Sequence, residues 1–136
     1  MKKVRSFLGF LLAVVVSTSF LSCQKAPING NLDGQWEVME VYPKPENEVI
    51  DQRLFYNFYL HVCQLTYYGG YFLDGEISYD GESLYINFPA KLNNFQVKGL
   101  SQYGISTNPV VFDVEFPDKN SLILSNEETM VVLRKF

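Results

Sequence analysis

From Gln35 to the C-terminus, apolar side chains alternate with polar ones, and turn residues recur at short intervals. Between residues 110 and 116, for example, every second residue is apolar, whereas Asp113 and Glu115 fall between them. This period of two places the apolar residues on one face of a β-strand and the acidic residues on the other. Consecutive strands of this kind predict an all-β fold with antiparallel neighbours.

The turn residues divide this part of the chain into strands. Pro43 ends the first strand, and Asp80-Gly81 is typical of a two-residue hairpin turn. The run from residue 54 to 67 is longer than an average strand, so we expect a bulge or bend within it, and a second one at Asp74-Gly75. The predicted strands cover residues 35–42, 54–67, 71–79, 83–88, 110–116, 121–125 and 129–135.

One segment between the strands has helical spacing. Leu100 and Tyr103 are three residues apart, and Gly104 is suited to end a helix, so we predict a short helix over residues 97–103. Counting a bend in the long run, the chain then has seven to eight strands and one helix. Neighbouring antiparallel strands favour an up-and-down β-barrel, since closure removes exposed sheet edges. A two-sheet sandwich is the structural alternative.

The N-terminus has the pattern of an export signal. Lys2, Lys3 and Arg5 precede an uncharged run of fourteen residues, 7–20, whereas a spanning helix needs about 20. The sequence Phe20-Leu21-Ser22-Cys23 is typical of a bacterial lipobox. We therefore predict a signal peptide over residues 1–22, cleavage after Ser22 and lipid on Cys23; an uncleaved membrane anchor is the alternative.

Cleavage would leave a lipidated tether, residues 23–31, and one domain, residues 32–136. The lipid on Cys23 would hold the protein to a membrane of the cell envelope. We expect an outer-membrane lipoprotein, and the lack of an acidic cluster after Cys23 favours the periplasmic face. The cleaved chain would carry eight basic against fifteen acidic residues, a formal charge of −7. Such an acidic domain does not suit nucleic acid or anionic lipid headgroups as partners.

Enzyme and metal signals are few. With Cys23 lipidated, Cys63 is the sole remaining thiol, and a buried inert thiol is the simplest expectation. A catalytic use of Cys63 would need His61 as its base, two residues away on the same strand face. Because His61 is the only His, a multi-His metal site is excluded, and no phosphate-binding Gly loop or nucleophile elbow occurs. We expect a protein that is not an enzyme and holds no metal or cofactor.

Two motifs carry a family resemblance. Gly34-Gln35-Trp36 has the Gly-x-Trp signature that opens the first strand of lipocalins, and Arg134 lies on the last strand. With the lipobox and the strand pattern, the chain resembles the small lipocalin-like lipoproteins of Bacteroidota. The resemblance implies a lipocalin-like β-barrel with a ligand pocket. Because the first and last strands pair when a barrel closes, we expect Gly34, Trp36 and Arg134 to form the closure, with the guanidinium over the indole ring.

A dense aromatic cluster is the candidate ligand or partner face. Its members lie on the two predicted strands before and after Gly69-Gly70. The alternative is that one face of these strands is core and the other stiffens the hairpin through cross-strand pairs. The candidate residues are Tyr56, Phe58, Tyr59, Tyr67, Tyr71 and Phe72.

Two functions fit these features. The first is a membrane-anchored lipocalin-like domain that binds a small hydrophobic ligand, which predicts a hollow barrel. The alternative is a non-catalytic structural or protein-interaction lipoprotein that binds another envelope protein. It predicts a filled barrel core and an exposed aromatic patch.

Overall fold

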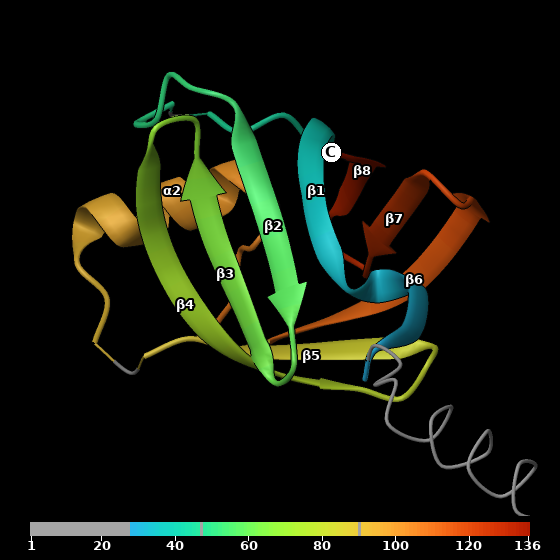
Figure 1. Cartoon of the computed structure of the whole chain (residues 1–136). Coiled ribbons are helices and arrows are strands. Elements are labelled where there is room, and N and C mark those ends of the chain that lie inside the picture. Colours follow the sequence, from blue (N-terminus) through green and yellow to red (C-terminus); the bar gives the residue numbers. More distant parts are fainter. Residues whose placement is uncertain (1–27, 47, 90) are drawn as a thin grey trace, which may run out of the picture.

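A computed structural model describes residues 28–46, 48–89 and 91–136. In these residues eight antiparallel strands form one closed barrel, accompanied by one α-helix and a short 3-10 helix (Figure 1). The predicted signal peptide, the cleavage site at Ser22 and the lipid site at Cys23 lie outside the described residues. The barrel confirms the predicted up-and-down fold and excludes the sandwich alternative.

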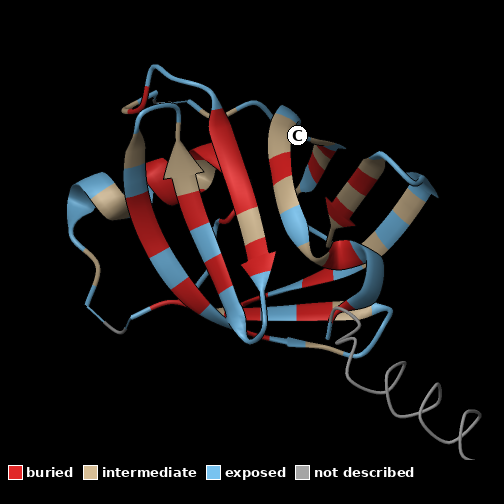
Figure 2. Ribbon diagram, viewed as in Figure 1, coloured by how far each residue is buried: buried red, intermediate tan, exposed pale blue. Residues whose placement is uncertain are grey.

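Each strand pairs with the next one in the sequence, and the last strand returns to pair with the first. The elements are η1 (Gly30–Leu32), β1 (Gly34–Tyr42), β2 (Leu54–Tyr59), β3 (Val62–Tyr67), β4 (Gly70–Tyr79), β5 (Ser83–Asn87), α2 (Asn94–Gln102), β6 (Val110–Asp118), β7 (Ser121–Ser125) and β8 (Met130–Lys135). Along most strands buried and exposed residues alternate, as the red and pale blue bands of Figure 2 show. The apolar residues of the sequence pattern therefore face the barrel interior.

The long run over residues 54–67 forms two strands rather than one bent strand. It turns at Leu60-His61, where Leu60 takes a φ of 54°. Such a left-handed backbone costs about 1–2 kcal/mol for a residue with a side chain, so hairpin turns normally use Gly, Asn or Asp there. The turn has no such residue, which is why the sequence pattern did not reveal it. His61 is therefore in the turn and does not share a strand face with Cys63, contrary to the prediction.

The predicted irregularity at Asp74-Gly75 lies elsewhere in β4. The β3–β4 register shifts between Leu65 and Thr66, opposite which β4 carries one extra residue, Phe72. Gly75 itself continues the strand. A side chain at Gly75 would collide with Phe88 across the sheet, so this glycine permits close packing inside the barrel rather than a bend.

Helix α2 begins three residues earlier than predicted, because Asn93 caps it. The Asn93 side chain accepts a hydrogen bond from the Gln96 backbone N–H, and the Gln96 side chain accepts one from the Asn93 N–H. This reciprocal pair satisfies two donors at the helix start. Gly104 follows the helix with a φ of 81°, as expected of a residue that ends a helix. No helix in the described part of the chain is long and apolar enough to span a bilayer.

Trp36 closes the barrel at the end where β1 begins. Its side chain is fully buried, and the indole N–H donates to the Leu32 carbonyl at 2.9 Å. The cation over its ring is Lys135, whose Nζ lies 4.6 Å from the ring centroid and donates to the Asp33 carbonyl at 2.7 Å. The β1–β8 register places Lys135 opposite Trp36.

The predicted contact between Arg134 and Trp36 is therefore wrong by one residue. In the ladder Arg134 lies opposite Glu37, and neighbouring residues of a strand point to opposite faces. Arg134 is exposed on the outside. Gly34 does belong to the closure, because it takes a φ of 126° and a side chain there would collide with the Lys135 side chain.

We expect Trp36→Ala to lower the free energy of unfolding by about 3–5 kcal/mol, since it removes a large buried side chain. Arg134→Ala is the matched control on the adjacent strand and should change it by no more than about 0.5 kcal/mol. Urea unfolding followed by circular dichroism measures both. Equal stabilities of the two variants would contradict the closure by Trp36.

Candidate functional site

The predicted aromatic face does not form one surface. Tyr56, Phe58 and Phe72 are buried inside the barrel, and Tyr67 is half-buried. Tyr59 and Tyr71 point outward with exposed fractions of 70% and 57%. They lie near opposite ends of the sheet, because β4 runs in the same direction as β2, and Tyr59 is the last residue of β2 whereas Tyr71 lies near the start of β4. Ladder geometry thus divides these residues between core and surface.

Aromatic and aliphatic side chains pack together in the barrel interior. Tyr103, which follows α2, stacks on Phe72 with ring centroids 5.5 Å apart and meets the edge of Tyr56 at 5.7 Å. The Tyr56 hydroxyl donates to the Tyr103 carbonyl, and the Tyr103 hydroxyl donates to the Thr66 carbonyl. Helix α2 packs on the same ring of Phe72 through Gly99. The hollow centre expected of a carrier is thus occupied by packed side chains of the protein itself.

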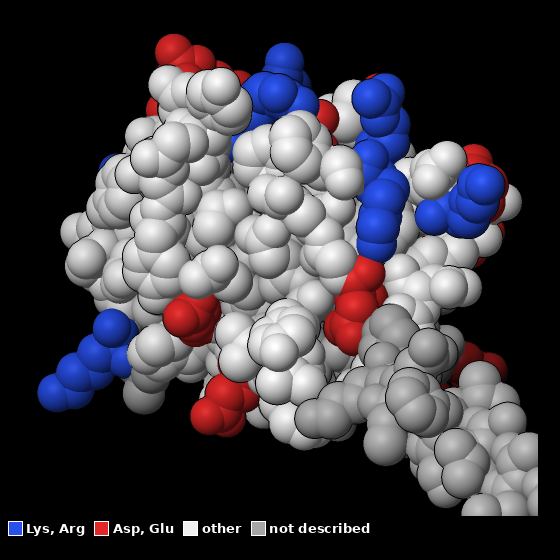
Figure 3. Space-filling model, in the orientation of Figure 1, with Lys and Arg blue, Asp and Glu red and all other residues white. Residues whose placement is uncertain are grey.

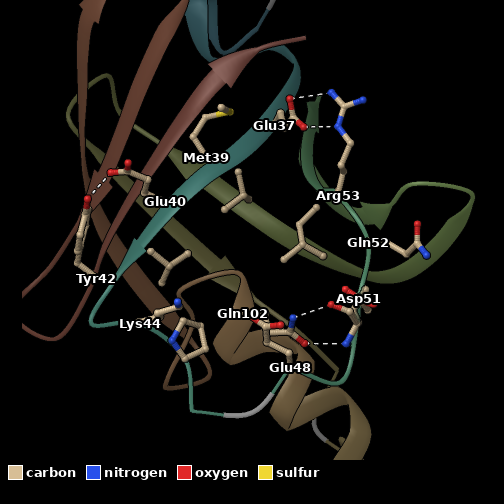
Figure 4. Close-up of a pocket in the computed structure, with 15 residues that line it drawn as sticks. Glu37, Met39, Glu40, Tyr42, Lys44, Glu48, Asp51, Gln52, Arg53 and Gln102 are labelled. Carbon is tan, nitrogen blue, oxygen red and sulfur yellow. Dashed lines mark hydrogen bonds and ion pairs between the residues drawn. The ribbon is translucent and has the colours of Figure 1, made fainter.

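A groove of about 600 Å³ lies on one side of the barrel, where β1 separates from β2 (Figure 4). Residues 34–37 of β1 pair with β2, but the rest of β1 pairs only with β8. The segment after β1 swings outward and returns as residues 50–54, which form the opposite wall of the groove. The groove is thus a seam in the barrel wall, bordered by one strand and one loop.

A β-bulge in β1 sets the side chains of this groove. Met39 is an extra residue in the β1–β8 ladder, between Val38 and Glu40. Because of it, Val38 and Val41 both pack against the core, and Glu40 stays outside. Without the bulge, the alternation of β1 would have directed Glu40 into the barrel. Val38, Val41, Ile50 and Leu54 give the groove an apolar floor.

Gln102, the last residue of α2, fixes the loop wall. Its Oε1 accepts hydrogen bonds from the Val49 and Ile50 N–H groups at 2.9 Å each, and its Nε2 donates to the Ile50 carbonyl at 2.8 Å. Gln102 is buried, so these bonds replace water for both partners. Sequence reasoning missed Gln102. Its place beside Tyr103 on the predicted helix was a signal for burial, but nothing local indicates a partner some 50 residues away.

An ion pair closes the groove at one end. Arg53 donates from Nη2 to Glu37 Oε1 at 2.8 Å and from Nε to Oε2 (Figure 4). This bidentate hydrogen bond lowers the pKa of Glu37 and raises that of Arg53. The guanidinium also lies over the rings of Phe55 and Phe136, at 5.6 Å and 5.4 Å from their centroids. The Arg53 side chain is therefore held in place from two sides.

The remaining rim of the groove has an excess of acidic side chains. Glu40, Glu48 and Asp51 line it against one basic residue, Lys44. Glu40 accepts a hydrogen bond from the Tyr42 hydroxyl, which raises the pKa of Tyr42. An apolar floor under an acidic rim suits a ligand that carries both apolar and positively charged groups.

Cys63 is a free and fully buried thiol, as the sequence predicted. Burial raises its pKa far above the usual range, with a smaller contribution from Asp74. A thiol of this kind is a poor nucleophile, and His61 is exposed in the neighbouring turn. Within residues 28–46, 48–89 and 91–136, no three His, Cys, Asp or Glu side chains gather as a metal site would require.

Residues 17–136 match the family model of the lipocalin-like domain. The chain belongs to the lipocalin-like family. A lipocalin-like protein from Bacteroides uniformis has a similar crystal structure, with 26% sequence identity and a TM-score of 0.58 over 79% of this chain and 100% of that one. The fold is also similar to that of an uncharacterized protein from Bacteroides eggerthii, at 21% identity and a TM-score of 0.53, over 76% and 98% of the two chains. No curated protein has a significantly similar sequence.

Family membership confirms the predicted lipocalin-like barrel and its resemblance to proteins of Bacteroidota. A lipocalin-like barrel is compatible with binding of a hydrophobic ligand. In this lipocalin-like protein, however, packed aromatic and aliphatic side chains occupy the interior. Outside this packed interior, the groove beside β1 has room for a ligand, and a recess of about 630 Å³ lies beside β4 and β5 at Val62, Glu76 and Asn108. We take the groove as the candidate site because it combines an apolar floor with an unpaired stretch of β1.

We expect Gln102→Leu to destabilise the barrel by about 1–3 kcal/mol for each backbone group left buried without a partner. Hydrogen exchange should also accelerate at the Val49 and Ile50 amides. The control is Gln64→Leu on the exposed face of β3, which should leave both quantities close to wild type. Unchanged exchange at these amides in Gln102→Leu would show that Gln102 does not hold the loop.

We expect the barrel to lose stability at alkaline pH. Burial raises the pKa of Cys63, Tyr56 and Tyr103 in the folded chain, whereas in the unfolded chain these groups ionise at about 8.5 for Cys and about 10 for Tyr. The folded state therefore binds more protons in this range, and its stability is complete below about pH 8 and falls as the pH rises. Urea unfolding from pH 6 to 11 measures this decline.

The variant Cys63→Ala separates the contributions. It removes the group with the lowest unfolded pKa, so the decline should begin nearer to pH 10, about where unfolded Tyr ionises. An unfolding free energy that stays constant up to pH 11 in the wild type would contradict the burial of these three groups.

Proposed function

We propose that this protein is a lipid-anchored, non-catalytic binding protein of the cell envelope whose groove receives an extended segment of a partner protein. The observation that carries the proposal is the sheet edge beside the groove. Residues 38–42 of β1 pair with β8 on one side, and no strand among the described residues pairs with their other side. An edge of this kind is a template for another strand.

Backbone geometry explains how a peptide would bind. In an antiparallel ladder, alternate residues direct their N–H and C=O groups to opposite neighbours. Over five residues, a length of roughly 16 Å, β1 can offer its outward-directed groups to an added strand. These hydrogen bonds do not depend on the side chains of the partner, so they contribute affinity rather than selectivity.

The lining of the groove would select the partner segment. Side chains that point inward would contact the apolar floor formed by Val38, Val41, Ile50 and Leu54. Side chains near the rim would meet Glu40, Glu48 and Asp51, which favour Lys or Arg. The expected partner segment is therefore an extended stretch in which apolar and basic residues alternate.

The lipid anchor is supported by the lipobox that ends at Cys23 and by the basic and apolar segments before it. Lipid on Cys23 after cleavage behind Ser22 would hold the barrel at the outer membrane, and we favour the periplasmic face. Partner proteins of the envelope would then meet the groove at a membrane surface.

We expect Cys23→Ser to release the protein from the membrane fraction, because the anchor would be the acyl chains on this residue. The wild type and Cys63→Ala should both remain bound, and immunoblots of separated fractions measure the distribution. Membrane association that persists in Cys23→Ser would contradict the anchor.

A small hydrophobic ligand is the second candidate function. The lipocalin-like family and the apolar floor of the groove favour it. Because packed side chains fill the barrel, such a ligand would lie in the groove and not at the barrel centre.

Selection from a random peptide library on the purified protein tests the groove. We expect enriched peptides with alternating apolar and basic residues, and at least tenfold weaker binding to Glu40→Lys/Asp51→Lys. Asp113→Lys/Glu115→Lys is the charge-matched control, since both residues are exposed on the outside of β6. Hydrogen exchange should show new protection at residues 38–42 on binding.

Two results would contradict the peptide proposal. Enriched peptides that bind both charge variants equally would place binding elsewhere. The second result is that no peptide is enriched, but an apolar fluorescent probe binds the wild type and fails to bind the Met39→Trp variant. The small-ligand function would then replace the peptide proposal.

A further inference from the structure

Large apolar side chains are exposed at the end of the barrel where the described chain begins. Tyr59, Leu60 and Val62 form the tip of the β2–β3 hairpin, with exposed fractions of 70%, 42% and 40%. Ile28, the first described residue, is 59% exposed. We call these four residues the apolar tip. No contact inside the described barrel accounts for so much exposed apolar surface at one end.

The apolar tip is held together by one hydrogen-bonded residue. Asn29 donates from Nδ2 to the Leu60 carbonyl at 2.8 Å and to Asp33 Oδ1 at 2.7 Å. These bonds fix Asn29, the neighbour of Ile28, against the hairpin turn. Tyr59 and Val62 face each other across the same hairpin. The four side chains therefore belong to one end of the molecule.

Leu60, the residue at the turn, indicates a contact between the apolar tip and something outside the barrel. Leu60 occupies a left-handed position with a φ of 54°, where Gly, Asn or Asp would be less strained. An exposed Leu there does not serve the turn, so a contact with something apolar outside the barrel explains its presence better.

The length of the preceding chain identifies what that contact is. Cys23 precedes Ile28 by five residues, and a fully extended chain of this length spans at most about 18 Å. If lipid is attached to Cys23, which is the anchor proposed above, this end of the barrel stays close to the bilayer. We propose that the apolar tip docks on the membrane surface, with Tyr59 and Leu60 at the boundary between headgroups and acyl chains.

Charge around the tip specifies the kind of lipid. Val62 lies opposite Glu76 in the β3–β4 ladder, and Asp33 lies beside Asn29. Figure 3 shows the uncharged surface at the lower edge of the molecule, where the hairpin turns, with acidic side chains on both sides of it. Acidic neighbours would be repelled by anionic headgroups, so the tip suits a zwitterionic lipid surface.

Docking at this end would also orient the groove. The loop that borders the groove connects β1 to β2 at the opposite end of the barrel from the β2–β3 turn. With the apolar tip on the membrane, the loop end would point away from the bilayer. A partner protein could then reach the edge of β1 without displacing lipid.

A fluorescent label at position 60 tests the docking. The full chain, lipidated in its host, carries Leu60→Cys and is reconstituted on phosphatidylcholine vesicles. Lipid would block Cys23 and Cys63 is buried, so an environment-sensitive thiol dye attaches at position 60. Met130→Cys, at the opposite end of the barrel, is the matched control. We expect blue-shifted emission at position 60 and several-fold stronger quenching by spin-labelled lipid than at position 130.

Mass spectrometry of the Cys23 peptide separates two failures. Absence of lipid on that peptide would overturn the anchor proposed above and, with it, this docking. A lipidated peptide with equal quenching at positions 60 and 130 would overturn the docking alone. Addition of phosphatidylglycerol should weaken quenching at position 60, and stronger quenching would contradict the preference for zwitterionic lipid.

A second variant keeps the test independent of folding. Tyr59→Ser/Leu60→Asn places a better-suited residue in the turn, so its midpoint in urea should not fall below that of the wild type. With the label moved to Val62→Cys in this background, quenching should drop to the level of position 130. Full quenching in this variant would show that Tyr59 and Leu60 do not make the membrane contact.

Discussion

The structure depends on one strand that is shared between two neighbours. A barrel closes only if its first strand pairs with both the second and the last, and β1 does this at Trp36 and Glu37, which pair with β2 on one side and with β8 on the other. Its first four residues bond to β2, while the remainder follows β8 alone. The extra residue Met39 allows this by changing the direction and twist of the strand. Closure around Trp36 at one end and the open groove at the other are two results of the same constraint.

The filled interior changes what a lipocalin-like barrel can do. Tyr103 and Phe72 meet inside it, and their polar partners are satisfied within the protein. Opening this core for a ligand would separate these rings and expose buried hydrogen-bonding groups, which costs about 1–3 kcal/mol for each group left unpaired. Binding at the surface avoids this cost. The barrel is then a rigid support that holds a sheet edge, an acidic rim and an apolar tip at fixed positions.

Local patterns in the sequence were sufficient for much of the fold. Alternation and turn residues predicted β7 with its correct bounds and the position of the turn at Asp80-Gly81, because both depend on neighbouring residues only. The connection there has three residues, 80–82, rather than the predicted two, and Gly81 takes the positive φ. The hairpin at Leu60-His61 escaped because an apolar residue takes the left-handed position. Lys135, and not the predicted Arg134, lies over the Trp36 ring. The sequence pattern could not reveal this, because the β1–β8 register joins residues about 100 positions apart. A shift of one position in such a ladder moves a side chain to the other face.

The candidate site was less predictable for the same reason. Residues chosen for their aromatic character were divided between core and surface by the ladder, whereas the groove arises where two strands part. Gln102 and Ile50 meet across 52 positions of sequence, and no local pattern records that contact. What the sequence does hold is the acidic character of the loop after β1 and the lipobox pattern that predicts a signal before Cys23, and both enter the proposed function.

The barrel is filled by its own side chains, and we propose that it binds its partner at the surface. Native mass spectrometry of the secreted Cys23→Ser protein, purified gently from its host, tests this most directly. We expect the mass of the polypeptide alone, also after incubation with a lipid extract of the host. A reproducible additional mass that is released on activation and persists in Glu40→Lys/Asp51→Lys and Met39→Trp would contradict binding in the groove, because such a ligand would have to lie inside the barrel or in the recess beside β4 and β5.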